Sequence, residues 1–167
     1  MHRIALLGIV FLAGADSTWQ TYSAPSPGKF SISFPAKPQE SARKLGDVNL
    51  YIVSADPNAF SRYMVYHFDT NAKAEQLKQP EFREKMLDDG QRVLLGRLSG
   101  SPAQSKITLD GNPGRAVEVT EAGKGTTRLR LYLVQSRLYI LAAQSRGGKD
   151  LPSADADKFL KSFKLSR

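Results

Sequence analysis

Three arginines and two tyrosines near the C-terminus are the residues best suited to binding chemistry. Arg128, Arg130 and Arg137 alternate with Tyr132 and Tyr139 in the segment TTRLRLYLVQSRLYILAAQS, residues 126–145. Guanidinium groups bind carboxylates through paired hydrogen bonds, and aromatic rings attract cations. The group could therefore bind a carboxylate, a sugar acid or an acidic protein. The alternative is that a helix covers the tyrosine rings while the arginine tips reach water.

His67 is the other residue whose type could support catalysis or metal binding. It is the one histidine beyond residue 2, and Asp69 shares its strand face. A metal site needs further ligands nearby, and a Ser-His-Asp triad cannot be assembled from this pair alone. The chain contains no cysteine, which excludes thiolate catalysis, disulfides and Cys-based metal sites. We therefore predict no catalytic residue, no metal and no cofactor, and a strand histidine bonded to the backbone.

Three further motifs resemble functional sites but favour structural roles. Asp155-Ala156-Asp157 lacks the remaining ligands and the glycine of a calcium loop, and acids in a first helical turn complement the helix dipole. Gly123-Lys124-Gly125 precedes a strand instead of a helix, so it predicts a turn and not a phosphate loop. The carboxylate pairs Asp88/Asp89 and Glu81/Glu84 lie on an amphipathic helix and predict a solvated face.

The alternation within residues 126–145 predicts a β-hairpin. With Gln135-Ser136 as a two-residue loop, Val134 faces Arg137. One face is then wholly aliphatic and predicts the core side, because successive side chains of a strand point to opposite faces. Gln-Ser is not a preferred pair for a tight turn, so the loop could be one or two residues longer. The aliphatic face consists of Leu129, Leu131, Leu133, Leu138, Ile140 and Ala142.

The remaining elements follow from the same patterns. Residues 29–34, 50–54, 60–68, 105–109 and 115–121 predict strands, with turns at 56–58 and 110–114. Residues 73–79 predict a polar connector. Pro80 opens a helix that the apolar spacing continues to about residue 98. Gly90 and Gly96 each weaken it by about 1 kcal/mol relative to alanine, so a break near Gly90 is an open alternative.

A second helix is predicted over residues 153–163, with Ser153 as its N-cap. Its large apolar residues Phe159, Leu160 and Phe163 should dock it onto the sheet. The fold class is therefore α+β. We expect a twisted antiparallel sheet of about seven strands, packed with a central amphipathic helix on one face and the C-terminal helix on the same or the opposite face.

The N-terminus has the pattern of a secretory signal. His2 and Arg3 precede an apolar run over residues 4–12 and the small residues Ala13-Gly14-Ala15. The stretch from Ile4 to Ala15 is about 18 Å long as a helix, against about 30 Å of hydrocarbon, so we expect no stable membrane insertion. Ala15 stands where a lipobox would require cysteine, so we expect no lipid anchor. We predict a signal peptide at 1–15, an extended leader at 16–28 and a single domain at 29–167. The alternative for residues 1–15 is a retained helix.

The charge balance suggests an anionic partner. The chain has 24 basic and 16 acidic side chains, a net charge of +8. Removing residues 1–15 takes away Arg3 alone, which leaves 23 against 16, or +7. For an exported protein, periplasmic or extracellular, the predicted partner is a protein or an anionic envelope component and not nucleic acid. The charge could equally serve solubility alone.

A resemblance to a known family adds to this interpretation. Phe30-Ser31-Ile32-Ser33-Phe34-Pro35, one long central helix, late hairpins and Phe159-Leu160-Lys161-Ser162-Phe163 together resemble the PsbP-like superfamily. That family includes the PsbP subunit of photosystem II and exported bacterial proteins of the DcrB and LpqN kind, which this chain resembles most. The resemblance covers roughly residues 19–167 and implies an antiparallel sheet between helices, with binding or assembly roles instead of catalysis. Family members differ in partner, so no functional residue is carried over.

Three functions are compatible with these features. The leading hypothesis is a non-enzymatic, exported accessory protein that binds a protein or an envelope polymer. The second is a small-molecule binding module that holds an anionic ligand with Arg128, Arg130 and Arg137. A hydrolase is third, and it would require a pocket that combines His67 with two acids. The oligomeric state has no sequence signature here.

Overall fold

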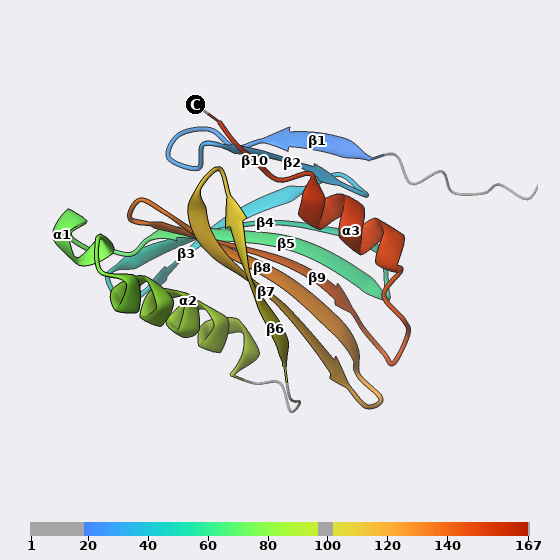
Figure 1. The fold of residues 1–167 in the computed structure, drawn as a ribbon. Coiled ribbons are helices and arrows are strands. Elements are labelled where there is room, and N and C mark those ends of the chain that lie inside the picture. Colours follow the sequence, from blue (N-terminus) through green and yellow to red (C-terminus); the bar gives the residue numbers. More distant parts are fainter. Residues whose placement is uncertain (1–18, 97–101, 167) are drawn as a thin grey trace, which may run out of the picture.

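A seven-stranded antiparallel sheet forms the centre of the fold, in the computed structural model that describes residues 19–96 and 102–166. One long helix, α2 (Pro80–Leu95), covers one face of this sheet. The C-terminal helix α3 (Ser153–Lys161) and a small second sheet cover the other face (Figure 1). The predicted α+β class is confirmed, and the two helices lie on opposite faces. The strand order is β3 (Gln39–Leu45), β4 (Val48–Asn58), β5 (Ser61–Asp69), β9 (Arg137–Ser145), β8 (Gly125–Val134), β7 (Asn112–Glu121), β6 (Ala103–Leu109).

The small sheet is built from the two ends of the described chain. Its order is β1 (Gln20–Ser23), β2 (Phe30–Phe34) and β10 (Lys164–Leu165). The stretch predicted as an extended leader therefore holds a strand, and Gln20 pairs with Phe34. The alternation in β2 buries Phe30, Ile32 and Phe34 against the main sheet. Residues 1–15, predicted as a signal peptide, lie outside the described residues.

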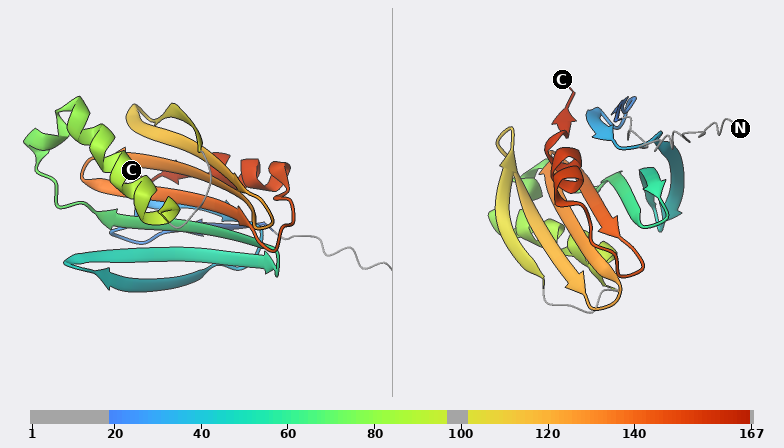
Figure 2. Two further views of the ribbon diagram at one scale, coloured as in Figure 1. Left: turned by 90° about the horizontal axis from the view of Figure 1, so that it is seen from below. Right: turned by 90° about the vertical axis from the view of Figure 1, so that its right-hand side faces the viewer.

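The β8–β9 hairpin has the predicted register and faces. Val134 pairs with Arg137, so the loop is Gln135-Ser136, and Gln135 adopts a left-handed conformation with φ of 51°. All six residues of the predicted aliphatic face are buried in one hydrophobic cluster, together with Leu87 of α2. On the opposite face, Tyr132 and Tyr139 share a cluster with Phe159 and Phe163. The two sides of one hairpin thus contribute to two cores, and α2 and α3 lie on opposite sides of the sheet (Figure 2).

Helix α2 runs without a break through Gly90. That residue is buried, and a Cβ atom there would overlap the side chain of Leu138. The glycine therefore permits close contact between helix and sheet, which outweighs its low helix propensity. The helix ends at Leu95, and residues 97 and 98 of the predicted helix lie outside the described residues.

Several boundaries differ from the prediction. Strand β3, of sequence QESARKL, is exposed along its whole length at the edge of the sheet, so no alternation of apolar residues marks it. The predicted connector contains the short helix α1 (Ala74–Leu77). Strand β4 continues through the predicted turn to Asn58, with an irregularity after Ala55. Ser153 is the first residue of α3 and not its cap, which is Pro152. The predicted turn at Gly123-Lys124-Gly125 is confirmed between β7 and β8.

Within residues 19–96 and 102–166, no helix is both long and apolar enough to cross a bilayer.

Candidate functional site

The predicted arginine and tyrosine group does not form one exposed surface. The rings of Tyr132 and Tyr139 are each 3% exposed. Tyr132 stacks on Phe163 with ring centroids 5.9 Å apart and an angle of 3° between the planes. The hydroxyl of Tyr139 donates a hydrogen bond of 2.7 Å to the carbonyl oxygen of Gly28. Both tyrosines are therefore core residues that fix α3 and the β1–β2 loop to the sheet.

Each of the three arginines has an intramolecular acceptor. Arg128 donates to Glu118 at 2.6 Å and to Asp157 of α3 at 3.2 Å. Arg137 donates two bonds of 2.9 Å to the carboxylate of Asp69. Arg130 donates to the carbonyl oxygen of Leu160 at 3.2 Å. These partners favour the packing interpretation, and binding of an external anion by these residues stays a prediction.

The register also separates Arg137 from the other two arginines. Arg130 pairs with Leu141, whereas Arg137 pairs with Val134 near the loop of the hairpin. Four residues along a strand correspond to about 13 Å. Arg137 consequently lines a cavity at the loop end with Lys29 and Asp69. Arg128 and Arg130 line a different groove beside α3, together with Glu118 and Asp157.

A third groove, which we call the basic groove, runs between α3 and the small sheet. It has a volume of about 460 Å³. The side chains come from β1, β2, α3, the residue that follows α3, and β10, so the packing of α3 against β2 creates it. The hydroxyl of Ser162 joins the two walls, because it accepts the backbone N–H of Ser33 at 2.9 Å and donates to Phe159 at 2.8 Å. The lining is Thr21, Ser31, Ile32, Ser33, Lys158, Lys161, Ser162 and Lys164.

The lining of the basic groove carries three cations and no acid. Lys158 lies over the ring of Trp19, with its ammonium 4.3 Å from the centroid. Lys161 forms an ion pair of 2.9 Å with Asp157, in which the lysine side chain is 63% exposed. Lys164 is exposed on β10. The two grooves that Arg128, Arg130 and Arg137 line also contain acids, whereas the lining of the basic groove has lysines and no acid.

Sequence reasoning did not select these lysines. Lys158, Lys161 and Lys164 are spaced by three, which would place them along one helical face. The helix ends at Lys161, however, and Lys164 belongs to β10. The spacing was therefore an available signal. What it could not reveal is that β2 supplies the opposite wall of hydroxyl groups.

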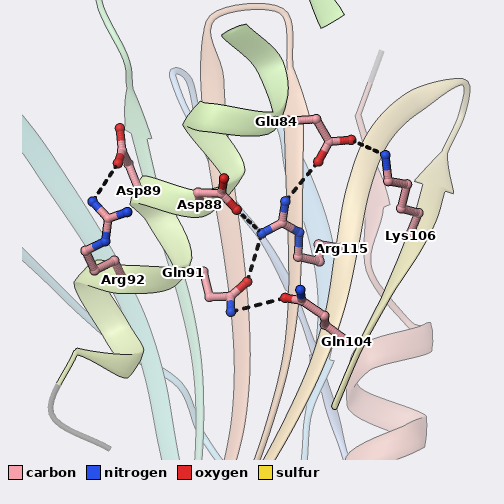
Figure 3. A network of polar contacts seen from close by, with 8 residues as sticks. All are labelled: Glu84, Asp88, Asp89, Gln91, Arg92, Gln104, Lys106 and Arg115. Carbon is pink, nitrogen blue, oxygen red and sulfur yellow. Dashed lines mark hydrogen bonds and ion pairs between the residues drawn. The ribbon is translucent and has the colours of Figure 1, made fainter. Parts of the chain in front are cut away.

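A separate polar network joins α2 to the sheet (Figure 3). Arg115 of β7 lies at its centre, with a side chain that is only 10% exposed. It donates to Glu84 at 2.9 Å, to Gln91 at 3.0 Å and, by a short contact, to Asp88. Lys106 of β6 donates to the other oxygen of Glu84 at 2.7 Å. The acids of α2 thus orient the helix across β6 and β7.

The charges of this network favour a structural role. Hydrogen bonds from Lys106 and from Arg115 lower the pKa of Glu84, which keeps its carboxylate ionised. A general acid needs the opposite shift, a raised pKa. Glu84 and Asp88 have partly exposed side chains, as predicted for a solvated face, but they also bind Arg115. No group of three or more His, Asp or Glu side chains in the described ranges could hold a metal ion.

His67 is buried in the aromatic core of the other face. It is 5% exposed, and its Nδ1 atom has no hydrogen-bond partner. The predicted backbone bond is therefore not present at Nδ1. Burial, aided by Arg137, lowers the pKa of His67 from 6.5 to about 4, so the imidazole is neutral at pH 7. The adjacent cavity includes Glu40 but not the second acid that the hydrolase hypothesis required.

Comparison with known proteins supports the fold. The structure is similar to that of cyanobacterial PsbP (CyanoP) from Synechocystis sp. PCC 6803, with a TM-score of 0.52 and 13% sequence identity. The match covers 95% of this chain and 98% of that one. At this level of identity the likeness shows a PsbP-like fold and nothing about activity. No protein-family model and no curated protein matches the sequence.

Proposed function

We propose that the protein is a non-enzymatic, exported accessory protein of the cell envelope that binds an anionic partner in the basic groove. The observation that carries this proposal is the charge of the groove, where three exposed lysines and several hydroxyl groups surround a cavity without an acid. Exposed ammonium groups attract carboxylates and phosphates over several ångströms, and hydroxyl groups then complete the hydrogen bonding. The net charge of +8 acts in the same direction.

The environment of the titratable groups supports binding over catalysis. The carboxylates of Glu84 and Asp88 are held by Arg115. His67 is enclosed by aromatic rings and lies outside the basic groove. A general acid or base must reach the proton that it transfers, and none of these groups lines the basic groove. A partner held there would meet cations and hydroxyl groups.

A small anionic ligand is the second candidate for the same groove. Its volume of about 460 Å³ lies within the range of ligand pockets. A competition binding experiment distinguishes a small anionic ligand from a macromolecular partner. A free dicarboxylate such as glutamate should displace a small-molecule ligand at a concentration near its own Kd. It should not displace a macromolecule that engages several lysines at once.

Affinity capture tests the proposal. Immobilised mature protein, beginning at residue 16, is incubated with envelope extract and eluted with salt. The groove variant replaces Lys158, Lys161 and Lys164 by glutamine. The control variant replaces Lys37, Lys44 and Lys85 by glutamine; these lysines are also exposed, and their exchange removes the same charge. We expect wild type and control to retain the same partner and the groove variant to lose it. Equal retention by all three proteins would contradict the proposal.

Export is tested by the N-terminus of the protein isolated from its host. Cleavage after Ala13-Gly14-Ala15 should leave a chain that begins at Asp16. Intact-mass spectrometry measures this directly. A mass that includes Met1, on material recovered with the membrane, would exclude processing at this position.

A further inference from the structure

Strand β3 forms one edge of the main sheet, and within the described residues its outer side pairs with no other strand. All of its residues, Gln39–Leu45, are exposed, and Figure 2 shows the strand at the margin of the molecule, beyond β4. The backbone groups of such an edge can pair with a further strand unless proline, a bulge or a central charge prevents it. Strand β3 has no proline and pairs regularly with β4, and its middle residues Ser41 and Ala42 are small. This edge can therefore accept a strand.

The symmetry of a possible dimer restricts how two copies of β3 can pair. Two antiparallel copies of one strand are related by a two-fold axis that runs perpendicular to the sheet. Directly paired residues have side chains on the same face, so the axis must pass a residue that faces its own copy. With the axis at Ala42, the middle of β3, residues at equal distances on either side of Ala42 face one another.

The charges around Ala42 are complementary in this register. Glu40 and Lys44 each lie two residues from Ala42, so the carboxylate of each copy faces the ammonium of the other. Lys37 and Asp47, just outside the strand, are each five residues from Ala42 and are both exposed. They face one another in the same way. Ala42 faces Ala42, so no large side chain obstructs the approach of the two strands at the axis.

Other symmetric registers lack this complementarity. An axis at Glu40, Arg43 or Lys44 places that residue opposite its own copy, and like charges that are directly opposite destabilise a strand pair. An axis at Ser41 pairs Glu40 with Ala42 and forms no ion pair within the strand. Axes at the ends of β3 leave most of its residues unpaired. The charge pattern therefore favours the axis at Ala42.

The opposite edge of the main sheet is protected against such pairing. Strand β6 has Lys106 at its middle, as the one charged residue of the strand. The ammonium of Lys106 is held by Glu84 of α2 at 2.7 Å. A lysine on an edge strand is a common protection against strand addition. Pairing through β3 alone gives a closed two-fold dimer and not an open filament.

The charged groups of β3 are accessible to a second copy. The side chains of Glu40 and Lys44 are exposed. Glu40 also interacts with the hydroxyl of Tyr22 in its own chain, but a carboxylate has about four acceptor positions and can accept an ammonium as well. No residue of β3 lines the basic groove. The pairing of β3 is therefore independent of anion binding in that groove.

We propose that two copies of this chain associate through antiparallel pairing of β3, centred on Ala42, so that the two main sheets form one continuous sheet. A single pair of seven-residue strands is a small interface, and interfaces below about 1,200 Å² are typically weak. We therefore expect a dissociation constant between about 10 µM and 1 mM.

Disulfide formation in the full chain tests the register. The sequence contains no cysteine, so a single introduced cysteine can form only an intermolecular bond. Ala42→Cys places two cysteines at the axis with Cα atoms about 4.5–5.5 Å apart, which suits a disulfide. The control Leu45→Cys, also at an exposed position, separates the two cysteines by about 20 Å. Mild oxidation should link Ala42→Cys and leave Leu45→Cys monomeric. Equal yields of linked dimer, including none from either variant, would overturn the register.

Charge exchange with sedimentation equilibrium tests the ion pairs. Glu40→Lys and Lys44→Glu each create two like-charge pairs across the axis, so each should weaken association about tenfold. The double exchange restores opposite charges and should return the affinity to that of the wild type. Glu40→Lys raises the net charge and Lys44→Glu lowers it, whereas the double exchange keeps it at +8.

General charge repulsion between copies predicts a different result, because it would make Lys44→Glu associate more tightly than the wild type. Stronger association of Lys44→Glu, or a double exchange as weak as the single ones, would contradict the proposed pairing. A wild type that remains monomeric at about 1 mM would do so as well. All exchanged residues are exposed, so the melting temperatures should be unchanged and differences in association do not reflect unfolding.

Discussion

At the scale of single residues, the burial of His67 makes the stability of the protein depend on pH. Its pKa is about 4 in the folded protein, against 6.5 for an exposed histidine. Between these values the unfolded chain binds the proton and the folded protein does not. The contribution is fully present above pH 6.5 and is lost as the pH falls toward 4.

The prediction is a loss of about 3 kcal/mol of unfolding free energy between pH 7 and pH 4 that is due to this residue. Urea denaturation at both pH values measures it, with His67→Phe as the comparison. Carboxylate protonation affects both proteins, so the difference between them isolates the histidine. Identical pH dependence of the two proteins would show that His67 titrates normally in the fold.

The candidate binding residues illustrate what a sequence conveys at this scale. Alternation along the strand placed Arg128, Arg130 and Tyr132 on one face correctly, because strand geometry has a strict period. The partners of the arginines could not be predicted, since Glu118, Asp157 and Asp69 come from other elements. The basic groove was missed for a similar reason. The basic groove forms only because β2 packs beside α3 and the residues that follow it.

At the scale of elements, Phe163 connects the C-terminal segment to both sheets. It is 4% exposed, and its ring lies 5.4 Å from those of Phe30 and Tyr139. Phe163→Ala should therefore lower the unfolding free energy by about 3–5 kcal/mol. Phe60, which is 49% exposed, gives the control, and Phe60→Ala should cost less than about 1 kcal/mol. Denaturant melts with equal losses for the two variants would show that the tail is not part of the core.

Arg115 has the corresponding role for α2. Replacing it by leucine leaves Asp88 without this partner and Glu84 with Lys106 alone, and these carboxylates are 52% and 39% exposed. Because water can solvate them in part, we expect a loss of about 1–3 kcal/mol, less than for a fully buried pair. Arg92→Leu removes an exposed pair with Asp89 and should cost about 0.5 kcal/mol or less. Equal effects in thermal or urea melts would contradict a special role for Arg115.

Most of the elements that the sequence predicted bury residues of one face, although β6 was predicted and has no buried residue. Strand β2 and the β8–β9 hairpin alternate because one side of each packs on a core. Strand β3 is exposed throughout. Only backbone pairing with β4 defines this strand, and such pairing leaves no pattern of apolar side chains in the sequence. Gly90 suggested a possible helix break because helix propensity describes an isolated helix and takes no account of contacts with the sheet. In the fold, the absence of a side chain at Gly90 leaves room for the side chain of Leu138 to pack against the helix.

At the scale of the whole molecule, the sheet separates two surfaces of different charge character. The α2 side carries the acids Glu84 and Asp88, which form ion pairs with Arg115 and Lys106. The α3 side carries the basic groove, whose lining has lysines without acids. Sequence composition gave the net charge, but only the fold shows that Lys158, Lys161 and Lys164 line one groove. The central claim is that this local excess binds an anionic partner.

The most direct test of that claim is the affinity for a labelled acidic polymer, poly-L-glutamate, measured by fluorescence anisotropy at several salt concentrations. Exchange of Lys158, Lys161 and Lys164 for glutamine should weaken binding about tenfold at low salt, if each exposed contact contributes several tenths of a kcal/mol. The difference should shrink toward physiological salt, where exposed charges are screened over about 8 Å. The control with Lys37, Lys44 and Lys85 replaced should bind like the wild type. If all three proteins bind equally, or if the affinity does not change with salt, the basic groove is not the binding site.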